Sequence, residues 1–202
     1  MGRRARLTPH AMNTLEIIAV ALGLANIGLL VRRSIWNFPF GLAMVACYFV
    51  IFREARLYGE AWLQVFFFAA QGWGWWLWAR AGGLAKMVSV GWMGWPARAA
   101  ALVLVAGLSL AIGWAMARWT DAALPYADAA IAGASVVAQV LLAMRRVENW
   151  AAWIAIDVLS IGVYIHRALY VTAGLYIVFL MLAAAGLAQW AKAAREGEGV
   201  EA

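Results

Sequence analysis

The stretch AAALVLVAGLSLAIGWAMA, from Ala99 to Ala117, contains no charged residue. A helix needs about 20 apolar residues to cross the hydrocarbon of a bilayer, so this stretch has the length of a transmembrane helix. Arg98 and Arg118 lie just outside it, where charged side chains reach the headgroup region. The stretch therefore predicts a helix whose surroundings are lipid.

Similar apolar runs lie on both sides of this stretch. Apolar residues make up 66% of the 202-residue chain and charged residues 13%, about half the charged share of an ordinary soluble domain. We therefore predict an all-α integral membrane protein with seven transmembrane helices. The six other runs are Leu15–Val31, Trp36–Phe52, Ala61–Ala79, Ala122–Met144, Trp150–Ile165 and Ala168–Trp190.

The net charge of +6 comes mainly from Arg and Lys between the apolar runs and at the termini. Trp and Tyr gather at the ends of the same runs, which is typical of an aromatic belt at the membrane surface. This arrangement favours membrane anchoring and disfavours nucleic-acid binding. The two sides of the membrane would have slightly different numbers of basic residues, and this difference weakly favours a cytoplasmic C-terminus. The single cysteine, Cys47, and the distant His10 and His166 give no support for a metal, haem or other cofactor.

The chain also resembles itself at a spacing of 114 residues. At this spacing Trp36 aligns with Trp150 and Trp76 with Trp190. This predicts a first three-helix repeat in residues 1–96, a linker helix in 97–120 and a second three-helix repeat in 121–202. Because the linker reverses the chain direction once more, the two repeats would be parallel, which is a known transporter architecture with the substrate bound between repeats.

Polar side chains inside the predicted spans are costly in lipid and therefore indicate a cavity or a partner helix. Trp150, Trp153 and Asp157 share one helix face, which Ser160 and Tyr164 extend. We expect this face to point inward. The complete set of candidate substrate-binding residues is Trp36, Asn37, Gln64, Ser135, Gln139, Trp150, Trp153, Asp157 and Tyr164.

Two alternatives to binding stay open for some of these residues. Gln64, Ser135 and Gln139 are also suited to hydrogen bonds that hold neighbouring helices together. Trp150 is also suited to anchoring at the membrane interface. Trp153 beside Asp157, in contrast, is typical of a site for a flat cation, because an indole face attracts cations and the carboxylate supplies a countercharge. Amide side chains would bind hydroxyl or carboxamide groups of the same molecule.

Several segments resemble the PnuC family of vitamin transporters, and together they extend over nearly all of Leu15–Trp190. The quoted motifs are Glu148-Asn149-Trp150-x-x-Trp153-x-x-x-Asp157, Trp36-Asn37-Phe38-Pro39-x-Gly41, Arg56-Leu57-Tyr58-Gly59-Glu60-x-x-x-Gln64, Gly72-Trp73, and Thr172-Ala173-x-Leu175-Tyr176 with Gly186 and Trp190.

The resemblance implies seven core helices in a three-plus-one-plus-three arrangement related to the SWEET sugar transporters, and a homotrimer in a bacterial inner membrane. It also implies facilitated diffusion of nicotinamide riboside between the two repeats. Thiamine or another vitamin, such as riboflavin, is the alternative substrate. In the family the position of Asp157 is occupied by an amide or an acid, so the subgroup stays open.

Two other classes of protein fit this sequence less well. A membrane enzyme would need a nucleophile with a base or a metal cluster, for which Ser135, Ser160 and His166 are the only candidates. A passive anchoring protein would not need acids and amides aligned on several helices. The sequence favours a transporter that is not an enzyme.

Overall fold

The computed structural model is all helical in the part that it describes, which comprises residues 9–54, 58–82, 84, 87–120, 124–166 and 170–196, with no side-chain description at 9–13, 58–60, 171 and 172. All seven predicted helices are present, so this prediction is confirmed. Most of them extend a few residues beyond the apolar runs, because charged and aromatic residues form their first and last turns. The helices are α1 Pro9–Val31, α2 Asn37–Glu54, α3 Tyr58–Arg80, α4 Trp95–Trp119, α5 Pro125–Ala143, α6 Glu148–His166 and α7 Tyr170–Arg195.

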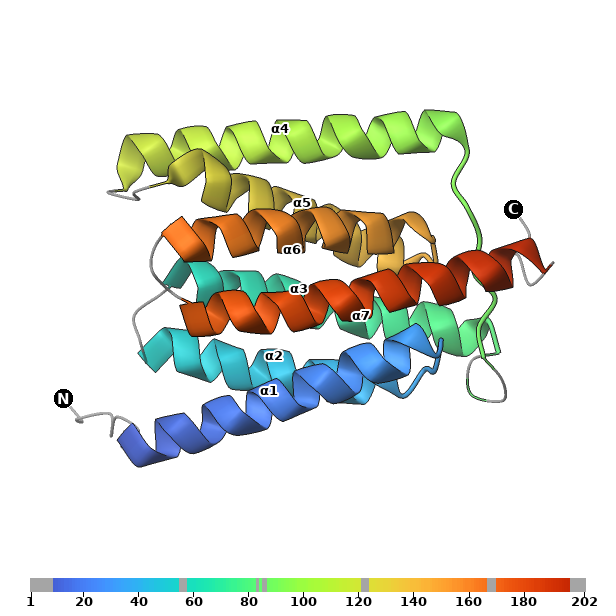
Figure 1. Ribbon diagram of the computed structural model, residues 1–202, viewed down its shortest axis with the longest axis horizontal. Coiled ribbons are helices and arrows are strands. Elements are labelled where there is room, and N and C mark those ends of the chain that lie inside the picture. Colours follow the sequence, from blue (N-terminus) through green and yellow to red (C-terminus); the bar gives the residue numbers. More distant parts are fainter. Residues whose placement is uncertain are drawn as a thin grey trace. The chain divides into compact units, whose positions relative to one another are not determined.

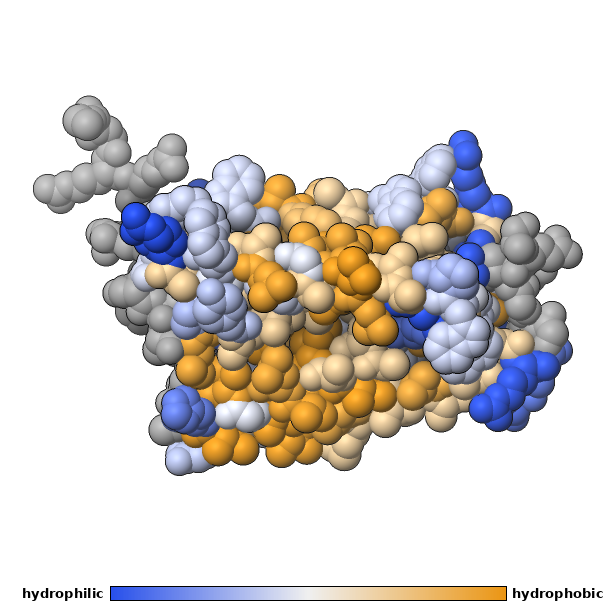
Figure 2. Space-filling view, turned by 90° about the horizontal axis from the view of Figure 1, so that it is seen from above, coloured by the Kyte–Doolittle hydropathy of each residue, from blue (hydrophilic) through white to orange (hydrophobic). Residues whose placement is uncertain are grey.

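Four of these helices are long and apolar enough by composition to cross a membrane, within the described residues: α1, α4, α5 and α7. The remaining three, α2, α3 and α6, are less apolar because polar residues interrupt them, among them Asn37 in α2, Gln64 and Gln71 in α3, and Asp157 in α6. Four such helices are consistent with a multi-pass membrane protein, and spanning by all seven stays a prediction. Figure 2 shows apolar side chains along the middle of one face and hydrophilic side chains at its two ends.

The chain divides into two compact units, residues 1–87 and 88–202. In the first unit α2 packs against both α1 and α3, and in the second unit α6 packs against both α5 and α7 (Figure 1). The fourth helix, α4, packs against α5 and so belongs to the second unit. The proposed division at residues 96 and 120 and the parallel arrangement of the repeats stay predictions.

The α1–α2 and α5–α6 turns have the same local structure. Arg33 and Arg145 have positive φ angles of 56° and 61°. The amide of Arg33 donates to the Leu30 carbonyl (2.8 Å) and that of Ser34 to the Leu29 carbonyl (3.0 Å). Arg145 and Arg146 make the corresponding bonds in the second unit, at 2.9 Å each. Both helices therefore end in a Schellman motif, with arginine at the position that glycine usually occupies.

This shared turn corrects the spacing of the repeat from 114 to 112 residues. Arg33 corresponds to Arg145, and Asn37 corresponds to Asn149. The side-chain amide of Asn37 donates to the Ser34 carbonyl at 2.7 Å, and that of Asn149 donates to the Arg146 carbonyl at 2.6 Å. Edge-to-face ring pairs follow the same spacing: Phe38 with Trp78 at 5.1 Å, and Trp150 with Trp190 at 5.6 Å. The spacing of 114 aligned Trp36 with Trp150, because the two residues are identical. In the folded units the residue equivalent to Trp150 is Phe38.

Close approach of α4 to α5 depends on two glycines. A Cβ atom at Gly113 would lie 2.5 Å from the Tyr126 ring, and one at Gly133 would lie 2.8 Å from Ser109 Oγ. Most of the remaining α4 surface is apolar and exposed, including Leu102, Val103 and Leu110. In a bilayer this surface is suited to lipid acyl chains.

Candidate functional site

The polar face of α6 is turned away from the exposed surface. Trp150 is 2% exposed, Asp157 is 5% exposed and Ser160 is fully buried. Trp153 and Tyr164, on the same face, are half-buried. Val158, Leu159 and Ile165, which lie elsewhere around the helix, are exposed. The prediction that the Asp157 carboxyl group avoids the lipid-facing surface agrees with this structure.

Asp157 has no hydrogen-bonding or ion-pairing partner among the described residues. None of the described Arg and Lys side chains is buried, so none supplies a countercharge in the interior. A buried carboxylate without a partner is energetically costly. The position is therefore suited to a cationic ligand that would neutralise it.

Two further candidates lie on α5, which packs against α6. Ser135 and Gln139 are separated by one helical turn and both are buried. Of the three residues between them, Val137 and Ala138 are buried and Val136 is half-buried, so this part of α5 lies in the interior of its unit. Ser135 and Gln139 are thus suited either to a ligand or to contacts between helices, and the alternative stays open.

Trp150 has a well-defined structural environment. Its ring packs edge to face on Trp190 and lies against Gly186, where an added Cβ would come within 2.5–2.6 Å of three ring carbons. Its Nε1 atom is buried without a partner in the described structure, as is Oδ1 of the neighbouring Asn149. Trp150 is therefore a packed interior residue and not an exposed anchor at the membrane surface, and its unpaired N–H is suited to an acceptor from a ligand or water.

The candidates of the first unit have different environments. Asn37 is 1% exposed and its side-chain amide donates to Ser34, so it holds the α1–α2 turn. Trp36 precedes α2 and is 61% exposed. Gln64 is half-buried on α3. A binding role for these three residues stays a prediction. The motif residues Arg56 to Glu60 lie outside the part of the chain whose side chains are described.

A cluster of two amides in the first unit, Asn26 and Gln71, was not among the sequence-based candidates. Asn26 on α1 donates from Nδ2 to the Asn37 carbonyl at 2.7 Å. Gln71 on α3 is buried, and its side-chain oxygen lies against Gly41 of α2, where it would overlap an added Cβ. The sequence shows all three residues, but only the folded unit shows that Gly41 leaves room for the two amides.

At the 112-residue spacing, the second unit has different residues at the positions of this amide cluster. Trp153 corresponds to Gly41, while Ala138 and Ala183 correspond to Asn26 and Gln71. Both alanines are buried. One unit thus combines a glycine on its middle helix with amides on its outer helices, and the other combines a tryptophan with alanines. The asymmetry is what an asymmetric ligand requires.

No cluster of His, Cys, Asp and Glu that could hold a metal ion occurs among the described residues. The buried groups of the second unit are an acid, amides, hydroxyls and indoles, which bind ligands by charge, hydrogen bonds and stacking.

A family model described as "Nicotinamide mononucleotide transporter" matches residues 13–192. The chain is 30% identical to the nicotinamide riboside transporter PnuC of Escherichia coli (strain K12) over 93% of this chain and 89% of that protein. The chain belongs to the PnuC family. It is therefore a member of a transporter family and not an enzyme, and it is a multi-pass membrane protein.

Two further proteins that the chain is similar to are informative. The riboflavin/roseoflavin transporter RibM of Streptomyces davaonensis is 25% identical over 87% of this chain and 83% of its own length. A crystal structure described as the vitamin B3 transporter PnuC matches with a TM-score of 0.75 at 24% identity, covering 90% of this chain and 82% of that one. The structural match supports the fold.

Proposed function

We propose that this PnuC-family chain carries nicotinamide riboside across a bacterial inner membrane by facilitated diffusion. The observation that supports the substrate most is the buried, unpartnered Asp157 on the same helix face as Trp153. The pyridinium ring of nicotinamide riboside is flat and positively charged. Stacking of such a cation on an indole contributes about 0.5–2 kcal/mol, and the carboxylate adds a direct charge interaction.

The charge of the site argues against the mononucleotide that gives the family model its description. A nucleotide phosphate is bound in proteins mainly by Arg, Lys or backbone amides. The described interior contains no Arg or Lys, and Asp157 would repel a phosphate. A riboside has the same cationic ring without the phosphate and therefore fits better.

Riboflavin, which the relative RibM is named for, has an uncharged ring at neutral pH and does not need an acid at this position. Thiamine is an aromatic cation and would satisfy Asp157 and Trp153 in the same way. Thiamine is therefore the second candidate. The two candidates differ in the group joined to the cationic ring, because the riboside has a ribose with several hydroxyls for Ser135 and Gln139, whereas thiamine has a single hydroxyl on a short side chain.

The remaining site assignments belong to this proposal. Trp153, with Trp150 beside it, would stack on the ring, and Ser135, Gln139 and Tyr164 would bind the ribose or the carboxamide. Trp36, Asn37 and Gln64 would complete the polar contacts, with the substrate held between the two repeats. The homotrimer, the SWEET-like arrangement and the cytoplasmic C-terminus are further parts of the proposal, and they rest on family resemblance and on the distribution of basic residues.

Uptake of labelled nicotinamide riboside, thiamine and riboflavin by cells that lack their own carriers tests the proposal. We expect expression of this chain to raise uptake of nicotinamide riboside alone. In proteoliposomes without ion gradients the riboside should equilibrate across the membrane, as facilitated diffusion requires. Uptake of thiamine in place of the riboside would support the second candidate, and uptake of neither would contradict both.

A further inference from the structure

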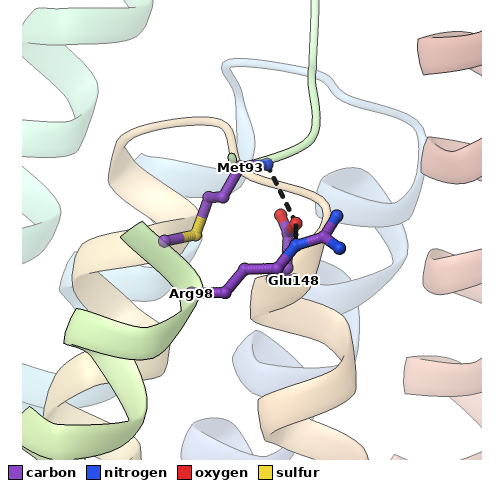
Figure 3. A network of polar contacts seen from close by, with 3 residues as sticks. All are labelled: Met93, Arg98 and Glu148. Atoms are coloured by element: carbon purple, nitrogen blue, oxygen red, sulfur yellow. Dashed lines mark hydrogen bonds and ion pairs between the residues drawn. The ribbon is translucent and has the colours of Figure 1, made fainter. Parts of the chain in front are cut away.

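The start of α4 is joined to the start of α6 by one carboxylate. Glu148 Oε1 accepts hydrogen bonds from the Met93 backbone amide at 2.9 Å and from Arg98 Nε at 2.8 Å (Figure 3). The Arg98 contact is also an ion pair, and both side chains are largely shielded from solvent. The second oxygen, Oε2, is buried without a partner in the described structure. Glu148 therefore serves two partners through a single oxygen atom.

Two aromatic rings also lie close to the Arg98 guanidinium. Its guanidinium carbon lies 5.1 Å from the centre of the Trp95 ring and 5.6 Å from that of Trp92. These distances are within the range of a cation–π contact. The arginine therefore has two kinds of contact in this place, an ion pair with Glu148 and cation–π contacts with the two rings.

The segment before α4, residues 87–94, is joined to the same place by its backbone. The Gly91 amide donates to the Arg145 carbonyl at 3.2 Å, and the Val147 amide donates to the Gly91 carbonyl at 3.0 Å. Val88 and Val90 are fully buried in this connecting segment. The segment and the α5–α6 turn therefore form one hydrogen-bonded structure, to which Glu148 adds α4.

Near its other end α4 lies against α5 through Gly113 and Tyr126, as described above. The helix is thus attached to α5 and α6 at two separate places. The sequence predicted α4 to be a linker helix outside both repeats. The contacts of α4 with α5 and α6 instead favour a role as a fixed part of the second unit.

We propose that Glu148 is a positioning residue for transport, which holds the connecting segment and α4 to α6 so that α4 moves with the second unit throughout the cycle. The inference rests on the proposed transport function, because it concerns the helix that carries Asp157. Glu148 itself does not contact the substrate. Its removal should therefore slow the conformational cycle while the binding groups of α6 stay in place.

A distance between α4 and α6 tests the positioning role without any transport measurement. Spin labels at the exposed Val103 and Val158, in a Cys47→Ala background, report that distance in liposomes. We expect one narrow distribution that nicotinamide riboside does not change. Glu148→Ala should broaden it, and Glu148→Gln, which keeps an acceptor oxygen, should largely restore it. A distance that changes with substrate in the unmodified chain, or a narrow distribution in Glu148→Ala, would overturn the proposal.

Uptake kinetics separate positioning from binding. For Glu148→Ala we expect a maximal rate reduced about tenfold with a substrate affinity within about twofold of normal. Glu196→Gln is the matched control, because it removes an acid from an exposed ion pair with Lys192 and should change neither quantity. A loss of affinity at an unchanged maximal rate would assign Glu148 to the binding site instead.

Two outcomes remain to be distinguished. If Glu148→Ala does not assemble in the membrane, Arg98→Gln decides, because it removes the partner of the same ion pair. We expect it to broaden the distance distribution and to slow transport, and normal distances and rates in this variant would refute the positioning role. If the unmodified chain does not carry the riboside, the proposed function fails, whereas the label distances still show whether Glu148 holds α4 to α6.

Discussion

At the residue scale, two arginines adopt a backbone conformation that glycine usually takes. Arg33 and Arg145 have positive φ angles at the ends of α1 and α5. The left-handed conformation costs roughly 1–2 kcal/mol for a residue with a Cβ. Because nothing in the sequence separates these arginines from the other basic residues between spans, the pair became visible only in the folded turns.

A comparison of two substitutions measures this cost at Arg33. Both Arg33→Ala and Arg33→Gly remove the charge, but only glycine relieves the strained conformation. We expect Arg33→Gly to be more stable than Arg33→Ala by about 1 kcal/mol in thermal unfolding of the purified protein. Equal stability of the two variants would show that the turn differs from the one described here.

Gly186 has no room for a Cβ atom, because an added Cβ would overlap the Trp150 ring. Gly186→Ala should displace the indole and reduce stability by about 1–3 kcal/mol, as overpacking does. Gly174→Ala in the same helix is the matched control. No heavy atom lies within 4 Å of its added Cβ, so it should stabilise α7 by about 0.5–1 kcal/mol. Thermal unfolding of both variants distinguishes the two effects, and similar shifts would contradict the packing of Trp150.

At the element scale, the helices themselves followed from the sequence, and the contacts between them did not. Runs of apolar residues bounded by charge predicted all seven helices, because the cost of exposing backbone groups to lipid leaves little alternative to a helix. The repeat was visible as well. Its spacing was wrong by two residues, since rare tryptophans drew the alignment to Trp36 and away from Phe38. The role of Asn37 and Asn149 in the turns was missed for the same reason.

The attachment of α4 to α5 gives a prediction at this scale. Gly113→Ala would place a Cβ 2.5 Å from the Tyr126 ring, whereas Gly107→Ala in the same helix meets no heavy atom within 4 Å. We expect Gly113→Ala to weaken the packing of α4, seen as faster hydrogen exchange in α4 and α5, and Gly107→Ala to leave exchange unchanged. Equal protection in the two variants would mean that α4 does not depend on this close approach.

At the scale of the whole molecule, the candidate site could be predicted in part. The inward face of α6 followed from helical spacing and from the cost of an acid in lipid. The amide cluster of Asn26 and Gln71 around Gly41 could not be predicted, because it depends on which helices pack together within a unit. In the second unit Trp153 corresponds to Gly41, and Ala138 and Ala183 correspond to the two amides.

In the proposed function, Asp157 recognises the positive charge of the substrate. A cationic and an uncharged form of the same molecule, nicotinamide riboside and its dihydro form, have nearly the same shape and therefore isolate the charge interaction. The most direct measurement is the affinity of both forms for the unmodified protein and for Asp157→Asn. The four affinities form a thermodynamic cycle that combines the change in ligand charge with the substitution. We predict that the unmodified protein binds the cation at least about tenfold more tightly than the dihydro form, a difference of about 1.4 kcal/mol, and that Asp157→Asn abolishes this preference. The same preference in both proteins would contradict the account.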